Sequence, residues 1–282
     1  LNYIIRHLQQ SFGKESRNST ENDSSTGGYG MEKIYAVGMG PGNAGQMTAE
    51  AREVIVSCDV IAGYTVYVDL VRKELKESEL EGKEFITTPM TQEVKRCRLA
   101  FEQAQKGKRV AMVCSGDAGV YGMAGLLLEI SGDYPEAEVE VVPGITAALS
   151  GAAVLGAPLV HDFAVISLSD LLTPWEKIEK RLRGAAKADF CTCLYNPSSR
   201  KRHDYLRKAC GIMLESKASD TVCGIVRNIG REGKSCAFCT LEELKDVETD
   251  MFTTVFVGNS QTKMVGGRMV TPRGYRNDRE QE

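Results

Sequence analysis

The sequence predicts an α/β fold in which helices cover both faces of a mostly parallel sheet. Two observations predict this class: short apolar runs alternate with amphipathic stretches along most of the chain, and several of these runs stop at a Gly-rich turn. The composition, with 42% hydrophobic and 26% charged residues, provides for a sizeable core. A chain of 282 residues has room for two domains of roughly 100 to 150 residues each.

The first patterned segment of the chain begins at Met31. Residues 11–30 before it are rich in Ser, Asn, Gly and charge, and they offer almost nothing apolar to bury. We therefore expect residues 1–30 to form a disordered N-terminal extension that contributes little to stability or activity.

An N-terminal α/β domain is expected over residues 31–144, where apolar periodicity and turn residues define the elements in chain order. The predicted elements are a strand at 33–37, a helix that carries Met47, Ala51, Val54, Ile55 and Cys58 at helical spacing, a strand at 60–62, a helix at 92–105, a strand at 109–114, a helix ending near Ser131 and a strand at 139–142.

A small, apolar stretch at 145–158 fits a helix and a hinge, and a C-terminal α/β domain is expected over 159–270. Thr173 as N-cap, Pro174 at the first helical position and Glu176 predict a capping box and a helix that starts at Pro174. The remaining predicted elements are strands at 163–168, 190–195, 221–226 and 254–257, a helix after Ser199, a hairpin around 230–233 and a charged tail at 271–282.

A Gly-rich turn, GMGPGN, follows the first predicted strand at residues 38–43. Glycines let a backbone approach a ligand closely, but a dinucleotide fingerprint needs a third glycine where this chain has Asn43, and an acid at the end of the second strand. Asp59 precedes that strand, and the chain has no GxxxxGK[ST] phosphate loop. On its own, this turn is either a ligand site or a plain tight turn.

Two further turns of this kind follow later strands, SGDAGVYG at 115–122 and PGITAA at 143–148. Because ligands of open α/β sheets bind at the carboxyl ends of the strands, we expect all three turns to converge on one crevice. This convergence favours a ligand site for the set. Taken alone, Asp117 in the second turn also fits a turn residue that caps the following helix.

The segments GMGPG, SGDAGVYG and VVPGITAA, in this order and at these separations, resemble the tetrapyrrole methylases, which use S-adenosylmethionine (SAM). The resemblance covers residues 31–270. Within that family, HDF at 161–163, SLSDLLTPW at 167–175 and YNPSSR at 195–200 resemble the branch of precorrin-3B C17-methyltransferases and their cobalt-dependent counterparts. The resemblance implies a mostly parallel sheet in the N-terminal domain, a mixed sheet in the C-terminal domain, and a homodimer.

The resemblance also implies an enzyme of cobalamin (corrin) biosynthesis that methylates C17 of precorrin-3B or cobalt-precorrin-3, with ring contraction to a precorrin-4 type product. SAM would bind as cosubstrate in the cleft between the domains, where Gly-rich turns suit a ligand without phosphates. Any cobalt would be held by the macrocycle, so no protein metal ligand is expected. Carried over residue by residue, the SAM contacts would be Gly40, Pro41, Gly42, Gly116, Asp117, Gly119, Tyr121, Thr146, Ala147, Tyr195, Asn196, Gly224 and Thr254.

The acceptor would be a tetrapyrrole with many acetate and propionate groups, which requires cations along the cleft. The densest basic run consists of Arg200, Lys201 and Arg202, and arginine can pair with a carboxylate through two N–H groups. The same run also fits a solvated helix face, so both interpretations of these substrate-binding candidates stay open.

Three polar residues near strand ends are the catalytic candidates. His161 is one of 3 histidines and is either a structural residue or a proton acceptor. Ser169 and Asp170 are comparable candidates at the end of the strand that follows it. The single Trp175 fits a packed helix residue better than a stacking platform.

Charge and composition exclude several other classes. A net charge of −3 gives no global attraction to nucleic acid or to an anionic membrane, and no run approaches the about 18 apolar residues of a membrane span. The first thirty residues also lack the order of a signal peptide, so we expect a cytoplasmic protein. The 9 cysteines fit reduced thiols, since Cys236 and Cys239 have no second pair with which to complete a structural zinc site.

Two rival interpretations remain at this stage. One is another member of the same superfamily, such as a methyltransferase for a different precorrin carbon, a diphthine synthase or an rRNA ribose methyltransferase. The segments at 167–175 and 195–200 argue against these. The other is a non-catalytic binding module with the same fold, against which the intact glycines and Asp117 argue.

Overall fold

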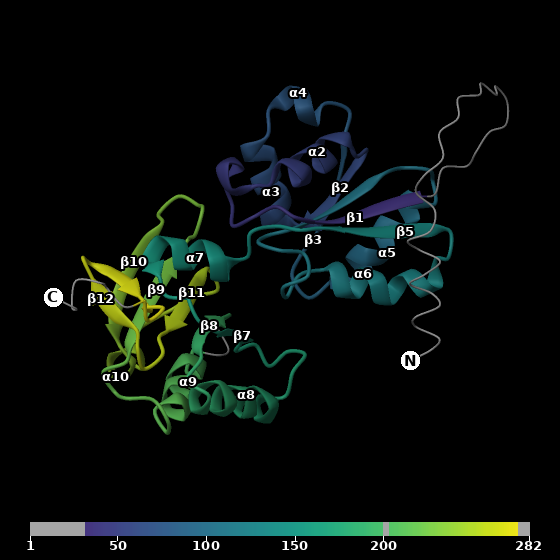
Figure 1. The fold of residues 1–282 in the computed structure, drawn as a ribbon. Coiled ribbons are helices and arrows are strands. Elements are labelled where there is room, and N and C mark those ends of the chain that lie inside the picture. The colour runs from purple at the N-terminus through teal and green to yellow at the C-terminus, as the bar shows by residue number, and fades with distance from the viewer. Residues whose placement is uncertain (1–31, 200–202, 276–282) are drawn as a thin grey trace, which may run out of the picture. The chain divides into compact units, whose positions relative to one another are not determined.

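The computed structural model of the protein describes residues 32–199 and 203–275 (Figure 1). The predicted extension at 1–30 and the last part of the predicted tail, residues 276–282, lie outside the described residues.

Five parallel strands form the first sheet, as the alternation of strands and helices predicts. Their spatial order is β3 (Glu84–Thr88), β2 (Val60–Tyr64), β4 (Val110–Cys114), β1 (Glu32–Gly38) and β5 (Ala137–Val142). Four of the five strands confirm the prediction, with ends within a few residues of the predicted ends; β3 was not predicted. The edge strand β3 escaped prediction because its segment EFITT is largely exposed or half-buried and carries no continuous apolar run.

Helices cover both faces of this sheet (Figure 1). Ile55 and Ile61 belong to the core on the face of α2 (Ala49–Ser57) and α3 (Thr65–Glu74). Phe101 and Ile34 belong to the core on the opposite face, under α5 (Glu93–Ala104) and α6 (Ala124–Ile130). Strand β4 is therefore buried at every position. The helical elements are, in chain order, η1 (Ala44–Gln46), α2 (Ala49–Ser57), α3 (Thr65–Glu74), α4 (Glu77–Leu80), α5 (Glu93–Ala104), α6 (Ala124–Ile130) and η2 (Ser131–Asp133).

The second sheet is mixed, because β7 (Phe163–Ser167) and β8 (Cys191–Tyr195) are parallel and all its other neighbouring strands are antiparallel. Its spatial order is β10 (Ser235–Thr240), β9 (Val222–Arg227), β11 (Thr253–Val257), β8 (Cys191–Tyr195) and β7 (Phe163–Ser167). The antiparallel pair β9 and β10 confirms the predicted hairpin. A small third sheet, absent from the sequence-based prediction, joins β12 (Lys263–Val265), β13 (Arg268–Val270) and β6 (Gly156–Ala157).

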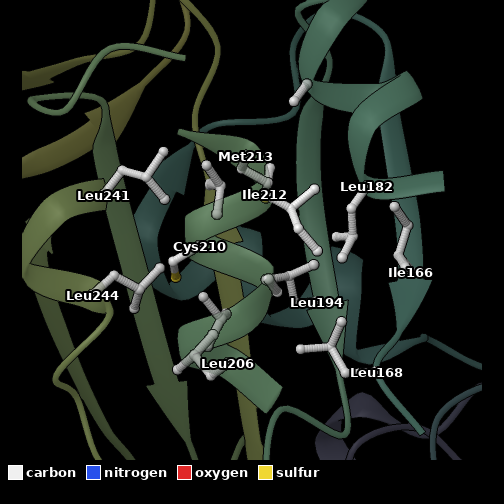
Figure 2. Close-up of a cluster of buried hydrophobic side chains, with 14 of the residues drawn as sticks. Ile166, Leu168, Leu182, Leu194, Leu206, Cys210, Ile212, Met213, Leu241 and Leu244 are labelled. Carbon is white, nitrogen blue, oxygen red and sulfur yellow. The ribbon is translucent and has the colours of Figure 1, made fainter. Parts of the chain in front are cut away.

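Helices also cover the second sheet on both faces. Helix α7 (Ala147–Leu155) buries Ala148 and Leu155 against Phe256 of β11. The opposite core, shown in Figure 2, contains Leu206 and Met213 of α9 (Tyr205–Met213) and Leu241 and Leu244 of α10 (Leu241–Leu244). The helices of this second core are α8 (Trp175–Lys187), α9 (Tyr205–Met213) and α10 (Leu241–Leu244).

The predicted capping box at the start of α8 is wrong. The N-cap is Pro174, whose ψ of 142° is extended, and no side chain caps the helix. Helix α8 therefore begins at Trp175, and Thr173 lies one residue too early to cap it. Trp175 packs against Tyr205 with ring centroids 4.6 Å apart, which confirms its interpretation as a packed helix residue.

Candidate functional site

Three loops meet backbone against backbone at the carboxyl edge of the first sheet. Gly40 and Gly116 exchange two hydrogen bonds, with N···O distances of 3.0 Å and 2.7 Å. A Cβ atom added at Gly144 would lie 2.2 Å from the Gly116 oxygen and 2.4 Å from the Gly38 oxygen. Only glycine fits so close a contact, and the expected convergence of the three Gly-rich turns is confirmed.

Asp117 joins two of these loops. Its Oδ1 accepts the N–H groups of Gly119 at 2.8 Å and Val120 at 3.1 Å, and its Oδ2 accepts that of Gly144 at 2.9 Å. The carboxylate thus satisfies backbone donors of the second and third turns. Contact between Asp117 and SAM stays a prediction.

A cavity of about 330 Å³ lies at this edge and draws its walls from both sheets. Strands β8 and β9 are both antiparallel to β11, so their carboxyl ends and the amino end of β11 share one edge of the second sheet. The described lining residues are Pro41, Tyr64, Tyr67, Met90, Ser115, Gly116, Val120, Tyr121, Thr146, Ala147, Ser169, Leu171, Tyr195, Asn196, Ser198, Ser199, Asn228, Ile229, Arg231, Met251, Phe252, Thr253 and Thr254.

Many of the residues expected to contact SAM line this cavity together. They are Pro41, Gly116, Tyr121, Thr146, Ala147, Tyr195, Asn196 and Thr254. The others have protein neighbours instead. A Cβ atom at Gly42 would lie 2.7 Å from the Cγ of Arg231, and one at Gly224 would lie 2.5 Å from a methyl carbon of Leu155. Gly40, Gly42, Asp117, Gly119 and Gly224 are not among the described residues that line the cavity.

The catalytic candidates separate in the structure. Ser169 lines the cavity. His161 places Nε2 2.9 Å from the carbonyl oxygen of Pro272, and Asp170 accepts the hydroxyl of Tyr205 at 2.6 Å. Neither His161 nor Asp170 is among the described lining residues. The substrate-binding candidates Arg200, Lys201 and Arg202 lie outside the described residues.

Tyr195 connects β8 to the start of α7. Its hydroxyl accepts the N–H of Ala148 at 2.5 Å and lies 2.6 Å from the hydroxyl of Thr146, the N-cap residue of α7. A helix start leaves its first N–H groups without intrahelical partners, and Tyr195 supplies one of the missing acceptors. Burial raises the pKa of Tyr195 to about 12, so the phenol stays neutral near pH 7.

Tyr121 makes a second connection, from the SGDAGVYG turn to β7. Its hydroxyl donates to the Val165 oxygen and accepts the N–H of Ser167, both at 3.1 Å. The backbone φ of 55° is left-handed, which is uncommon for a residue other than glycine and is held here by these contacts. Its ring centroid lies 5.7 Å from that of Tyr195, so two aromatic side chains form adjacent parts of the wall.

Arg231 is the lining residue of greatest chemical interest that sequence reasoning missed. It follows Gly230 in the turn between β9 and β10, where Nε donates to the Pro41 oxygen at 3.3 Å and Nη2 to Ser115 Oγ at 3.1 Å. The signal was present, because the predicted hairpin turn follows a strand, as the three Gly-rich turns do.

The part of the chain that the structure describes has neither a metal-binding cluster nor a membrane-spanning helix. No group of His, Cys, Asp and Glu there could hold a metal ion, and no described helix is long and apolar enough to cross a membrane. The 9 cysteines are free; Cys236 is exposed and Cys239 is partly buried.

The fold and the site define an α/β protein whose ligand cavity is built where the loops of two sheets meet. Residues 33–245 match the family described as Tetrapyrrole (Corrin/Porphyrin) Methylases. The chain belongs to this family.

Relatives and solved structures agree with that membership. A probable cobalt-factor III C(17)-methyltransferase of Salmonella typhimurium is 45% identical over 86% of this chain and 99% of its own length. A precorrin-3B C(17)-methyltransferase of a Sinorhizobium species is 36% identical over 86% of this chain and 96% of its own. The crystal structure of the methyltransferase CobJ superposes with a TM-score of 0.77 at 36% identity, covering 85% of this chain and 98% of that one.

Proposed function

We propose that this chain transfers the methyl group of SAM to C17 of a precorrin-3B type tetrapyrrole acid, with contraction of the ring, in cobalamin biosynthesis. The observation that carries the proposal is the match with the Salmonella C(17)-methyltransferase, which spans 99% of that protein at 45% identity. The cavity at the meeting point of the two sheets supports the same function, since Pro41, Gly116 and Thr146 of the three Gly-rich turns line it together with Tyr195 and Thr254 of the second sheet.

SAM fits the character of this cavity. A volume of about 330 Å³ is within the range of roughly 300 to 1,000 Å³ typical of small-molecule pockets. SAM supplies an activated methyl group on sulfur. In this proposal the backbone at Gly116 and Ala147 and the polar side chains of Thr146 and Asn196 bind and orient it, and the neighbouring tyrosines exclude water.

Catalysis in this proposal rests on positioning. Among the described lining residues none is Asp, Glu, His or Lys, and Tyr195 has its pKa raised to about 12 by burial. These residues therefore offer no general base that titrates near pH 7. Holding a carbon nucleophile in line with a methyl group can lower a barrier by roughly 7 to 11 kcal/mol, which does not require such a base.

The proposed acceptor carries cobalt. The relative named for cobalt-factor III is 45% identical, whereas the relative named for precorrin-3B is 36% identical. Turnover of both acceptors with SAM tests this choice: a higher kcat/KM for cobalt-factor III is expected, and a higher value for precorrin-3B would reverse it.

The basic run Arg200, Lys201 and Arg202 is proposed to bind acceptor carboxylates. Replacing each of the three by Gln should raise the acceptor KM in at least one variant and leave SAM affinity unchanged.

We further propose a homodimer that works in the cytoplasm. The implied dimer rests on the family resemblance of the sequence. Light scattering coupled to size exclusion should give twice the mass of the chain, and a mass of one chain at micromolar concentration would contradict the dimer. A fluorescent fusion in the native host should fill the cytoplasm evenly.

A further inference from the structure

Arg231 is the only charged side chain among the described residues that line the cavity. The rest of that lining consists of tyrosines, hydroxyl side chains, amides, backbone and apolar groups. No carboxylate of the described residues forms an ion pair with Arg231; its neighbour Glu232 pairs with Lys73 at 3.9 Å instead. The cavity therefore contains a cation for which the described part of the protein supplies no counter-ion.

The surrounding residues fix the guanidinium in place. Two of its N–H groups, on Nε and Nη2, are used by the Pro41 oxygen and Ser115 Oγ. The guanidinium carbon lies 5.1 Å from the ring centroid of Phe252, and the stem packs against Gly42, where a Cβ atom would lie only 2.7 Å from the Arg231 Cγ. Arginine has five N–H donors. Among the described residues only Pro41 and Ser115 accept from this side chain, so the outer part of the fork, including both N–H groups of Nη1, is left for another partner.

A partly buried charge of this kind is unfavourable unless something pairs with it. Desolvation lowers the pKa of Arg231, but an arginine whose ordinary pKa is above about 12 stays charged near neutral pH. Removing a charge from water is unfavourable, and a ligand carboxylate offsets that cost with two parallel charged hydrogen bonds.

We propose that Arg231 is the carboxylate-binding residue of the cavity and that it pairs with a carboxylate of a bound ligand through the free part of its guanidinium. This inference rests on the proposed function, which provides two sources of that group. One is the amino-acid end of SAM. The other is an acetate or propionate side chain of the tetrapyrrole acceptor. Gly42 then has a structural purpose, because it makes room for the arginine that the ligand needs.

The test compares Arg231→Gln and Arg231→Lys with the full-length parent protein. Lys234→Gln is the matched control, because Lys234 lies on the same hairpin, is exposed, and is not among the described lining residues. Calorimetry measures the affinity for S-adenosylhomocysteine and for 5′-methylthioadenosine, which lacks the amino-acid end. Fluorescence quenching measures the affinity for uroporphyrin III, which carries eight carboxylates. Circular dichroism and Tm report the folding of each variant.

Arg231→Gln should weaken the binding of one of the two carboxylate ligands by about tenfold or more. Arg231→Lys should lose less affinity, because lysine keeps the charge but cannot form two parallel hydrogen bonds. A lower affinity for S-adenosylhomocysteine, with unchanged affinity for 5′-methylthioadenosine, identifies the carboxylate of the cosubstrate as the partner of Arg231. A lower affinity for uroporphyrin III alone identifies a carboxylate of the acceptor as that partner. Unchanged affinities for both ligands, or an equal loss in Lys234→Gln, would overturn the inference.

A second measurement covers the case in which the Arg231 variants do not fold. Phenylglyoxal modifies arginine, and peptide mass spectrometry measures its attack on Arg231 in the parent protein. Protection of Arg231 by one of the carboxylate ligands, without protection by 5′-methylthioadenosine, is expected, and no protection by any of them contradicts the inference. Failure of the parent protein to bind S-adenosylhomocysteine at all would instead contradict the proposed function.

Discussion

Asp117 acts on the backbone of two loops at once. Its carboxylate accepts N–H groups from Gly119, Val120 and Gly144, so it joins the second Gly-rich turn to the third. A carboxylate in this position shapes a ligand site even where it does not touch the ligand, because both turns supply lining residues.

We predict that Asp117→Ala weakens SAM binding by about tenfold or more, since hydrogen bonds to a charged group contribute roughly 1.5 to 3 kcal/mol each. The far-UV circular dichroism should stay that of the parent, because the bonds lie in loops. Calorimetric titration with SAM measures the effect, and Asp133→Ala, at an exposed carboxylate in η2, is the control. Unchanged SAM affinity in Asp117→Ala would show that this loop is not part of the cofactor site.

At the residue scale, the sequence predicted site residues well where a residue type has few structural roles. Glycines and an aspartate after strands predicted the loops around the cavity, and their convergence is confirmed. It was less informative for side chains that reach the cavity from a neighbouring element. Arg231 is such a case, because its approach to Pro41 and Ser115 depends on tertiary packing between segments far apart in the chain.

At the scale of elements, the junction of the three turns depends on the absence of side chains. The Gly144 position meets two carbonyl oxygens closer than any Cβ atom can lie. Gly125, inside helix α6, offers the opposite case, since a Cβ atom there would have nothing within 4 Å.

Gly144→Ala and Gly125→Ala therefore form a matched pair. We expect Gly144→Ala to lower Tm by several degrees and to weaken SAM binding, because the turns must separate to admit a methyl group. Gly125→Ala should be neutral or should stabilise by roughly 0.5 to 1 kcal/mol, the usual gain from replacing glycine in a helix. Thermal unfolding measures both. Equal Tm values for the two variants would contradict the proposed tightness of the junction.

The sequence predicted the helices and strands correctly where a segment has a clear helical periodicity of apolar residues or a continuous apolar run. The buried strands β1, β2 and β4 read as continuous apolar runs, and α5 reads as an amphipathic helix. Strand β3, which is largely exposed or half-buried, and the short strands β12 and β13 do not give this signal, which is why they were missed. The capping box at Thr173 failed because the ψ angle of Pro174 moved the helix start by one residue, a choice that local sequence does not fix.

At the scale of the whole molecule, buried thiols link stability to pH. Burial raises the pKa of Cys97 and Cys210 to about 12, and of Cys58 and Cys114 to about 11. The same thiols in the unfolded chain titrate at about 8.5. The folded state therefore keeps protons that the unfolded state releases above that pH, and the free energy of unfolding must fall as pH rises from about 8.5 toward 12.

Urea unfolding under reducing conditions at several pH values between 7.5 and 10.5 measures this fall. Cys97→Ala should start from a lower stability, because it leaves a cavity, but should lose less on the way to pH 10.5 than the parent does. Cys236→Ala, at an exposed thiol, should follow the parent. A free energy of unfolding that stays constant or rises over this range would contradict the role of the buried thiols.

The central claim is methyl transfer to C17, and the position of a labelled methyl group on the product tests it most directly. The protein is incubated with cobalt-factor III and SAM that carries carbon-13 in its methyl group, and the product is examined by NMR. The account predicts a single labelled methyl group on C17 of a contracted ring. Label on another ring carbon, or no transfer to this acceptor or to precorrin-3B by a folded protein that binds SAM, would contradict it.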